Sequence, residues 1–145
     1  MDKIITIPPH MEIAFSQLGV KEWAGDPSNP QVEDYLRAVD LPSDDKIPWC
    51  AAWLNWVLLK AGLKGTGSGL ARSFLHWSQP IAEPEFGCVV VLRRGIDPRK
   101  GHVGFFINEY TGFILLLGGN QADQVGVNPY SKLRVISYRK VFYQQ

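Results

Sequence analysis

An almost wholly apolar stretch, residues 48–59, constrains the fold of this chain more than any other feature. It reads Pro-Trp-Cys-Ala-Ala-Trp-Leu-Asn-Trp-Val-Leu-Leu, with Asn55 as its polar exception. Pro48 suits the first turn of a helix, where a missing backbone N–H costs nothing. A helix that is apolar on every side has to be buried. The stretch therefore predicts a central helix around which the remaining elements pack.

Cys50 falls in the first turn of this expected helix. The unpaired N–H groups and the helix dipole there favour negative charge, so the thiol should lose its proton more readily than usual. A thiol with a pKa of ~8.5 is roughly 3% thiolate at pH 7, whereas one with a pKa of ~6 is roughly 90% thiolate. Cys50 is therefore a candidate nucleophile. The alternative, a small buried apolar residue, is equally compatible with this stretch taken alone.

The composition is that of an ordinary globular protein. The 145 residues suit a single domain with one core, spanning residues 1–145, and 46% of them are hydrophobic. The formal net charge of +1 gives no electrostatic reason to expect nucleic acid or a membrane surface as a partner. Two basic pairs, Arg93-Arg94 and Arg99-Lys100, are expected to belong to a solvated loop.

The cysteine content indicates a reducing compartment. Two cysteines, Cys50 and Cys88, cannot make a disulfide framework, and they lack the spacing of zinc ligands. We therefore expect reduced thiols and folding in a cytoplasm. Residues 1–4 do not read as the start of a signal peptide, and no apolar run approaches the ~20 residues of a membrane span. A target outside the cytoplasm would then require another protein to deliver this one or to open the way.

Helical patterns fill the first half of the chain and strand patterns the second. Helices are predicted for residues 10–20, 29–36, 48–59 and 70–77. Strands are predicted for residues 88–92, 102–107, 113–117 and 135–138, with a break at 118–121. The glycine-rich segment 65–69 lacks the lysine and the preceding strand of a P-loop, and is expected to be a flexible connector. Helices first and antiparallel strands second predict an α+β fold.

Three polar residues stand where the buried helix and the sheet would meet: Cys50, His102 and Asn120. Neighbouring antiparallel strands can hold His102 beside Asn120, with the helix of Cys50 packed across them. Cysteine catalysis needs such contacts between a nucleophile, a base and a group that orients the base. Asn120 would accept a hydrogen bond from the ring of His102 and fix its tautomer. Gln121 and Asp123 are the other candidates for that third place.

Each of these residues also has an explanation without catalysis. His102 could be a satisfied core histidine in a glycine-lined strand, and Asn120 could be a turn residue after two glycines. Cys88 begins an apolar strand and is expected in the core. His10 and His76 are expected at the surface. The residues taken one at a time leave these alternatives open.

Four blocks of sequence occur together and in order: Pro-Trp-Cys-Ala-Ala-Trp-Leu-Asn-Trp at 48–56, Gly-Thr-Gly-Ser at 65–68 with Ala-Arg-Ser at 71–73, Gly-His-Val-Gly-Phe at 101–105, and Gly-Gly-Asn-Gln at 118–121. Together they resemble the CHAP-like (cysteine, histidine-dependent amidohydrolase/peptidase) cell-wall hydrolases of phage lysis cassettes and bacterial genomes. The resemblance runs from about the first predicted helix to residues 138–139.

The resemblance implies a papain-like, CHAP-type α+β fold, with N-terminal helices packed on an antiparallel β-sheet. It implies a peptidoglycan hydrolase that cleaves an amide bond of the stem peptide, as an N-acetylmuramoyl-L-alanine amidase or an endopeptidase. By match of motif, Cys50 would be the nucleophile, His102 the base and Asn120 the third catalytic residue. Some relatives bind calcium, but no calcium-loop pattern occurs here and Asp44-Asp45 is a thin basis. We therefore expect no metal and no other cofactor.

The expected biological setting is that of a phage endolysin. Such a protein would wait as a monomer in the cytoplasm of the bacterial host until a holin opened the membrane, and would then reach the wall in the periplasm. One alternative is a secreted bacterial amidase effector with an immunity partner. Another is a non-catalytic wall-binding module with the same fold, and a third is a papain-like acyltransferase or isopeptidase acting on proteins or lipids.

Overall fold

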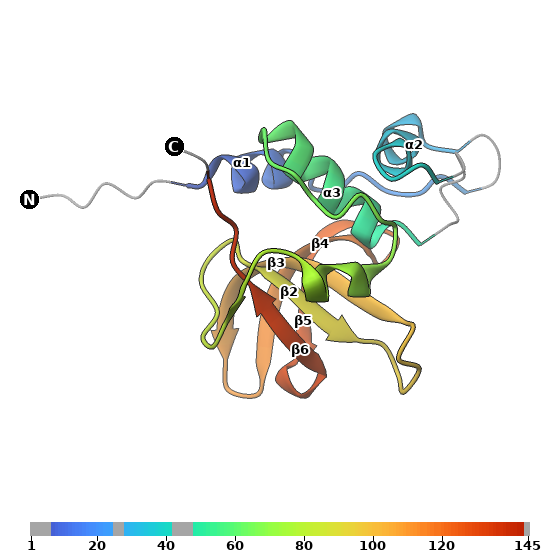
Figure 1. Ribbon diagram of the computed structural model, residues 1–145. Helices are drawn as coiled ribbons and strands as arrows, with labels where there is room; N and C mark the ends of the chain where they lie inside the picture. The colour runs from blue at the N-terminus through green and yellow to red at the C-terminus, as the bar shows by residue number, and fades with distance from the viewer. Residues whose placement is uncertain (1–6, 25–27, 42–47, 144–145) are drawn as a thin grey trace, which may run out of the picture.

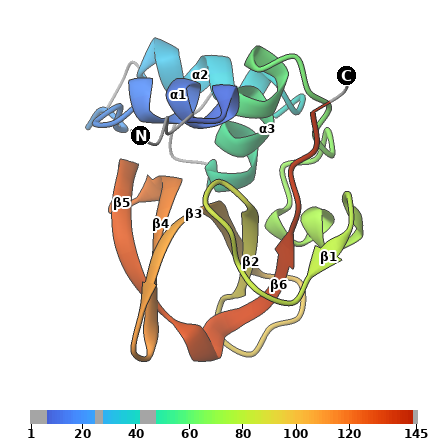
Figure 2. The same ribbon diagram turned by 90° about the vertical axis from the view of Figure 1, so that its left-hand side faces the viewer.

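The computed structural model describes residues 7–24, 28–41 and 48–143. Within these residues, helices form one layer and a six-stranded antiparallel sheet forms the other (Figure 1). The sheet is strongly curved, and the helices lie over one end of it (Figure 2). The prediction of an α+β chain whose N-terminal helices pack on an antiparallel sheet is therefore confirmed at this level.

Capping residues, prolines and glycines in the sequence mark where the helices begin and end. They are α1 (Pro9–Ser16), α2 (Pro30–Arg37), α3 (Cys50–Lys60) and two short 3₁₀ helices, η1 (Ala71–His76) and η2 (Lys132–Arg134). The Asn29 side chain caps α2 by accepting from the backbone N–H of Gln31 at 2.9 Å. Helix α3 begins at Cys50 rather than at Pro48, so the cysteine is its first residue. Gly62, with φ of +78°, follows its end, as expected for a glycine stop.

The strands, in chain order, are β1 (Pro80–Ile81), β2 (Val89–Arg93), β3 (Gly101–Tyr110), β4 (Phe113–Gln121), β5 (Gln124–Ser131) and β6 (Val135–Arg139). Their order in the sheet is β1-β6-β2-β3-β4-β5. The predicted break at residues 118–121 is wrong, because β4 continues through Gln121. Strand β5 was not predicted, since Pro129 interrupts its alternation. Proline is tolerated there because β5 is an edge strand of the sheet.

Helix α3 is the buried element that the sequence predicted. Its apolar side chains pack between α1, α2 and the strands β3 and β4. Trp53 is fully buried, and its ring meets that of Phe105 edge-on with 5.7 Å between the centroids. A Cβ on Gly119 of β4 would come within 2.7 Å of the Trp53 Cβ. Glycine at position 119 therefore lets the helix approach the sheet closely.

The five tryptophans differ in how deeply they are buried. Trp49 and Trp53 are fully buried, and Trp56 and Trp77 are half-buried. Trp23 is exposed. Because Trp49 and Trp53 are packed between the helices and the sheet, they determine the position of the first turn of α3 relative to the strands.

Candidate active site

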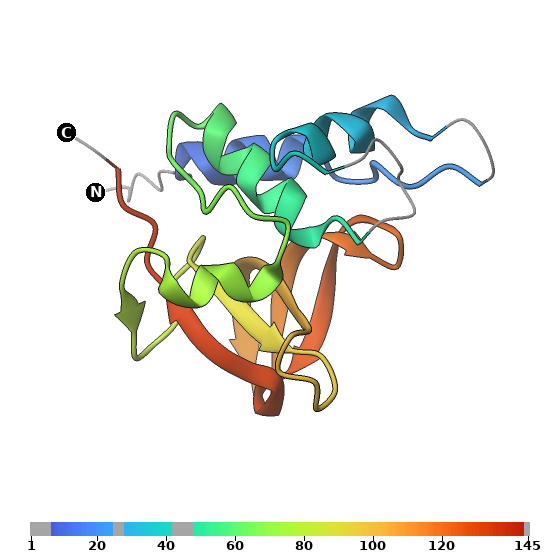
Figure 3. The same cartoon turned by 45° about the vertical axis from the view of Figure 1, so that its right-hand side comes forward.

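Cys50 lies at the start of α3, where the helix meets the sheet, and 8% of its surface is exposed. It lines a pocket of about 330 Å³ together with residues of the η1 segment and of the β2–β3 loop. Helix η1 packs on β2 and β3 beside the first turn of α3 (Figure 3). The residue that carries the thiol therefore lines a pocket and keeps a small exposed surface.

The surroundings of Cys50 favour its thiolate. Burial raises the pKa of the thiol, but four other influences act in the opposite direction. They are a hydrogen bond with His102, the charge of His102, a backbone hydrogen bond from Val103 and the charge of Arg94. Their sum holds the pKa of Cys50 below its usual value. The sequence-based expectation, which relied on the helix start alone, therefore has additional causes.

His102, the second residue of β3, brings its imidazole to Cys50 while only 4% of the residue is exposed. Its Nε2 atom lies 2.9 Å from Oε1 of Gln121, on the neighbouring strand β4. This contact occupies Nε2 and leaves Nδ1 as the ring nitrogen that faces the thiol. Cys50, His102 and Gln121, far apart in the sequence, are thus brought into one chain of contacts.

The orientation of the Gln121 amide determines the tautomer of His102. The Gln121 Nε2 atom lies 3.1 Å from the carbonyl oxygen of Leu116, 2.8 Å from that of Gly126 and 2.9 Å from Oδ1 of Asn128. Two of these partners are backbone carbonyls, which only accept, so this end of the amide must be the NH₂ group. The other end is the oxygen, and His102 Nε2 must donate to it. In neutral His102 the Nδ1 atom is then unprotonated and can accept the proton of Cys50.

The third place at the imidazole, expected for Asn120, belongs to Gln121 in the structure. Asn120 has φ of +57° and stands where the pairing of β4 with β5 slips between Gly118 and Gln121. In a regular strand residues 118 and 120 would share a face, but this irregularity puts Gln121 on the face of Gly118 instead. A Cβ on Gly118 would indeed lie 2.3 Å from Oε1 of Gln121 and 3.5 Å from Nε2 of His102. Asp123 is exposed in the following turn.

Tyr130 of β5 completes the surroundings of His102 and was not among the expected site residues. Its ring stacks on the imidazole with 5.2 Å between centroids and 28° between planes, and its hydroxyl lies 3.3 Å from Nε2. Burial raises the pKa of Tyr130 to about 12, and the charge of Cys50 acts in the same direction. The hydroxyl therefore stays protonated at neutral pH. Tyr130 could have been found by first predicting strand β5, because Val125 and Val127 alternate with other residues as in a strand.

The glycine-rich segment 65–69 is tied to α3 by Asn55, the polar exception in that helix. The Asn55 side chain is buried; it accepts from Gly67 N at 2.9 Å and donates to Ser68 O at 3.1 Å. A Cβ on Gly65 would fall 2.1 Å from Asn55 Oδ1, so glycine permits this approach. Gly69, at the end of the segment, lines the pocket of Cys50. The segment is thus a fixed wall of the site rather than only a connector.

The remaining thiol and imidazoles lie outside the site. Cys88 is buried, as predicted, and burial raises its pKa to about 11, so it is a poor nucleophile. His76 is exposed, as predicted. The prediction of a surface position for His10 is wrong, because only 2% of it is exposed. Its Nε2 lies 2.8 Å from Gly87 O, and its Nδ1 contacts the hydroxyl of Tyr143.

The described residues contain neither a cluster of metal ligands nor a membrane-spanning helix. No three His, Cys, Asp or Glu side chains gather there as a metal ion would require, and Asp44-Asp45 lies outside these residues. None of the helices in the same part of the chain has the length and the apolar run needed to cross a bilayer.

Known proteins supply no assignment for this site. No family model matches the chain, and no curated protein matches it either. The contacts of Cys50, His102 and Gln121 are therefore what supports a function.

Proposed function

We propose that this protein is a cysteine amidohydrolase with a papain-like, CHAP-type fold, which cleaves an amide bond in the peptide part of peptidoglycan. Cys50 is the nucleophile, His102 is the general base and acid, and Gln121 orients the imidazole in place of Asn120. The observation that carries the proposal is the imidazole of His102. Its Nε2 is held by Gln121, and the ring also makes a hydrogen bond with the thiol of Cys50, a residue that lines a pocket. The choice of peptidoglycan as substrate rests on the four sequence blocks that resemble CHAP-like hydrolases.

The first half of the reaction forms a thioester. His102 takes the thiol proton, and the Cys50 sulfur attacks the carbonyl carbon of the amide. The backbone N–H of Cys50 belongs to the first residue of α3, where helix N–H groups have no partner within the helix, and it donates to the oxyanion that develops. The C–N bond then breaks, and the protonated imidazole gives its proton to the leaving amine.

The second half releases the product. The imidazole, now neutral again, takes a proton from a water molecule that attacks the thioester carbon. The C–S bond breaks, the carboxylic acid leaves, and the proton returns to the sulfur–imidazole pair. The same nitrogen of His102 acts in both halves, which requires the ring to keep one orientation. The hydrogen bonds of Gln121 supply that constraint.

The biological role that fits this activity is lysis of a bacterial host by a phage endolysin. The protein would act as a monomer on the wall in the periplasm, after a holin has opened the cytoplasmic membrane. The nearest alternative with the same chemistry is a secreted amidase effector with an immunity partner. Genes for lysis or genes for secretion and immunity next to the coding sequence distinguish these two roles.

Digestion of purified sacculi tests the proposal. The parent protein, Cys50→Ala and Cys88→Ala are compared by release of new amino groups and by mass spectrometry of the muropeptides. Cys50→Ala should lower the rate by on the order of 10³-fold or more, whereas Cys88→Ala, the matched loss of the other thiol, should retain activity. The fragment masses identify the bond that is cut. Binding of the parent to sacculi without cleavage would contradict the proposal and favour a wall-binding module instead.

A further inference from the structure

The pocket beside Cys50 has a basic side. Its lining residues are Pro48, Cys50, Gly69, Leu70, Ala71, Arg94, Arg99, Lys100 and Gly101. The cations come from the loop between β2 and β3, and all three are exposed. The two basic pairs were expected in a solvated loop. Three of their four residues do lie in such a loop, and these three also line the pocket.

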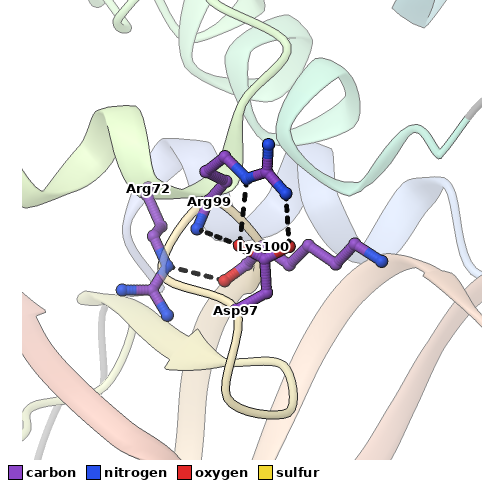
Figure 4. Close-up of polar contacts among 4 residues, drawn as sticks. All are labelled: Arg72, Asp97, Arg99 and Lys100. Carbon is purple, nitrogen blue, oxygen red and sulfur yellow. Dashed lines mark hydrogen bonds and ion pairs between the residues drawn. The ribbon is translucent and has the colours of Figure 1, made fainter.

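One of these cations is neutralised by a neighbour. Arg99 pairs with Asp97 of the same loop, with 3.1 Å between its NH2 atom and Asp97 Oδ2 (Figure 4). The backbone N–H of Arg99 also donates to Asp97 Oδ1 at 2.9 Å. In the described part of the chain, no ion pair joins Arg94 or Lys100 to an acidic side chain. These two cations therefore leave the pocket with a net positive charge.

The loop that carries them is anchored to the opposite wall. The Nε atom of Arg72, in η1, donates to the carbonyl oxygen of Lys100 at 2.6 Å (Figure 4). Gly101 permits this contact, because a Cβ there would lie 3.1 Å from Cγ of Arg72 and 2.9 Å from Leu92 O. Arg72 thus joins η1 to the loop that carries Arg94 and Lys100.

The positive charge of this pocket acts on the thiol of Cys50. Arg94 is one of the groups that hold the pKa of Cys50 below its usual value. Because Cys50, Arg94 and Lys100 line the same pocket, a substrate whose amide reaches Cys50 would place its neighbouring residue near these two cations. The volume of about 330 Å³ is at the small end of the range for small-ligand pockets, which suits one acidic residue rather than a polyanion.

We propose that Arg94 and Lys100 bind a carboxylate on the residue next to the scissile amide, so that the substrates of this enzyme are acidic peptides. The inference rests on the proposed function, because it takes Cys50 as the nucleophile. Exposed cations are screened by salt, so the selectivity is modest and falls as ionic strength rises.

Alkylation of Cys50 tests the pocket without any assumption about peptidoglycan. Iodoacetate carries a carboxylate, and iodoacetamide is its neutral counterpart of similar size. The ratio of their rates at Cys50, followed by peptide mass mapping, is compared with the same ratio for N-acetylcysteine. The parent should favour iodoacetate by about tenfold relative to that reference, and roughly 0.5 M salt should remove most of the preference.

Charge-removing variants locate the effect. Arg94→Gln and Lys100→Gln should each lower the iodoacetate preference by about twofold to fivefold. Arg93→Gln is the matched control, because it removes the same charge from the neighbouring position, which does not line the pocket. Two results would contradict binding of a carboxylate by Arg94 and Lys100. One is a rate ratio in the parent equal to that of N-acetylcysteine, and the other is an equal loss of the iodoacetate preference in all three variants.

Stem peptides then test the substrate class. Two synthetic peptides are compared, one with the free α-carboxylate of D-glutamate and one with the same group amidated. The parent should cleave the acidic peptide with a kcat/KM about tenfold higher, and Arg94→Gln should reduce this ratio. Equal cleavage of both peptides would overturn the inference while leaving the proposed function intact. Cleavage of neither peptide, nor of sacculi, would overturn the proposed function, and the alkylation ratio would still report on the pocket.

Discussion

The Nε2 atom of His102 lies 2.9 Å from Oε1 of Gln121, and the Gln121 amide nitrogen is held by backbone carbonyls of both β4 and β5. Two strands of the sheet thus fix the direction of one imidazole. Because Gln121 presents its oxygen, the ring nitrogen that faces Cys50 is the one free to take a proton. The reactivity of the thiol depends on this relationship.

Removal of the Gln121 carboxamide should impair the reaction without unfolding the protein. Gln121→Ala frees the imidazole to rotate or to adopt the other tautomer, so kcat should fall by about tenfold to a hundredfold with a smaller change in KM. Gln121→Asn should recover little, because its shorter side chain does not reach the ring. The readout is kcat, KM and the pH profile of sacculus hydrolysis.

Asn120→Gly is the matched control for that experiment. Glycine tolerates the φ of +57° found at position 120, so the backbone is kept while the carboxamide is lost. Activity near that of the parent is expected. A large loss of activity in Asn120→Gly with none in Gln121→Ala would show that Asn120, and not Gln121, orients the imidazole of His102.

Gly118 should be needed for the position of Gln121. A Cβ at residue 118 would lie 2.3 Å from Oε1 and 2.9 Å from Cδ of Gln121, so Gly118→Ala must displace the amide. We expect a loss of kcat similar to that of Gln121→Ala. In the Gln121→Ala background the same substitution should have little further effect, because both changes act on one contact. Additive losses in the double variant would show that Gly118 acts in some other way.

Stability should fall in mild acid because of His10. Burial lowers the pKa of His10 below its ordinary value of 6.5, although a hydrogen bond with Gly87 acts in the opposite direction. The unfolded chain therefore binds the proton first, and the free energy of unfolding decreases as the pH falls below 6.5 towards the lower pKa of the folded protein.

The measurement is denaturant unfolding at neutral pH and at about one unit below the ordinary histidine pKa, for the parent and for His10→Gln. Glutamine can keep a hydrogen bond to Gly87 but does not titrate. The decrease in unfolding free energy between the two pH values should be smaller in His10→Gln. An unchanged decrease would exclude His10 as its source.

Loss of the Asn55 side chain should loosen the wall of the pocket. Asn55→Ala removes the acceptor for Gly67 N and the donor to Ser68 O, both within a buried setting. We expect the unfolding free energy to fall by about 1–3 kcal/mol. Asn108→Ala is the control, since Asn108 is exposed and its loss should change stability by no more than about 0.5 kcal/mol. Equal effects of the two substitutions would argue against a structural role for Asn55.

Local sequence signals predicted most elements, because each depends on residues near in the chain. The apolar run of α3, the Asn29-Pro30 start of α2 and the glycine after α3 are signals of this kind. Strand β5 escaped prediction, since Pro129 is acceptable only at an edge, and which strand forms the edge is decided by the whole sheet.

The sequence predicted that Cys50 and His102 lie together, but it placed Asn120 beside the imidazole and kept Gln121 only as an alternative. Cys50 and His102 are marked by a helix start and a glycine-lined strand, and the structure brings them together. The choice between Asn120 and Gln121 depends on one irregular residue with positive φ, which reverses the alternation of β4. Asparagine is among the residues that tolerate this conformation, but nothing in the sequence requires it at position 120. The position of Arg94 and Lys100 at the pocket depends on where the loop between β2 and β3 folds back, and hydrophobic periodicity carries no information on that.

The pH dependence of iodoacetamide alkylation at Cys50 tests the thiol–imidazole pair most directly. In the parent, the rate should stay high as the pH falls well below ~8.5, the pKa of an ordinary thiol, because the pKa of Cys50 is lowered. His102→Gln removes the base, so its profile should move up towards that of an ordinary or buried thiol. Superimposable profiles for the two proteins, both with the dependence of an ordinary thiol, would contradict the account.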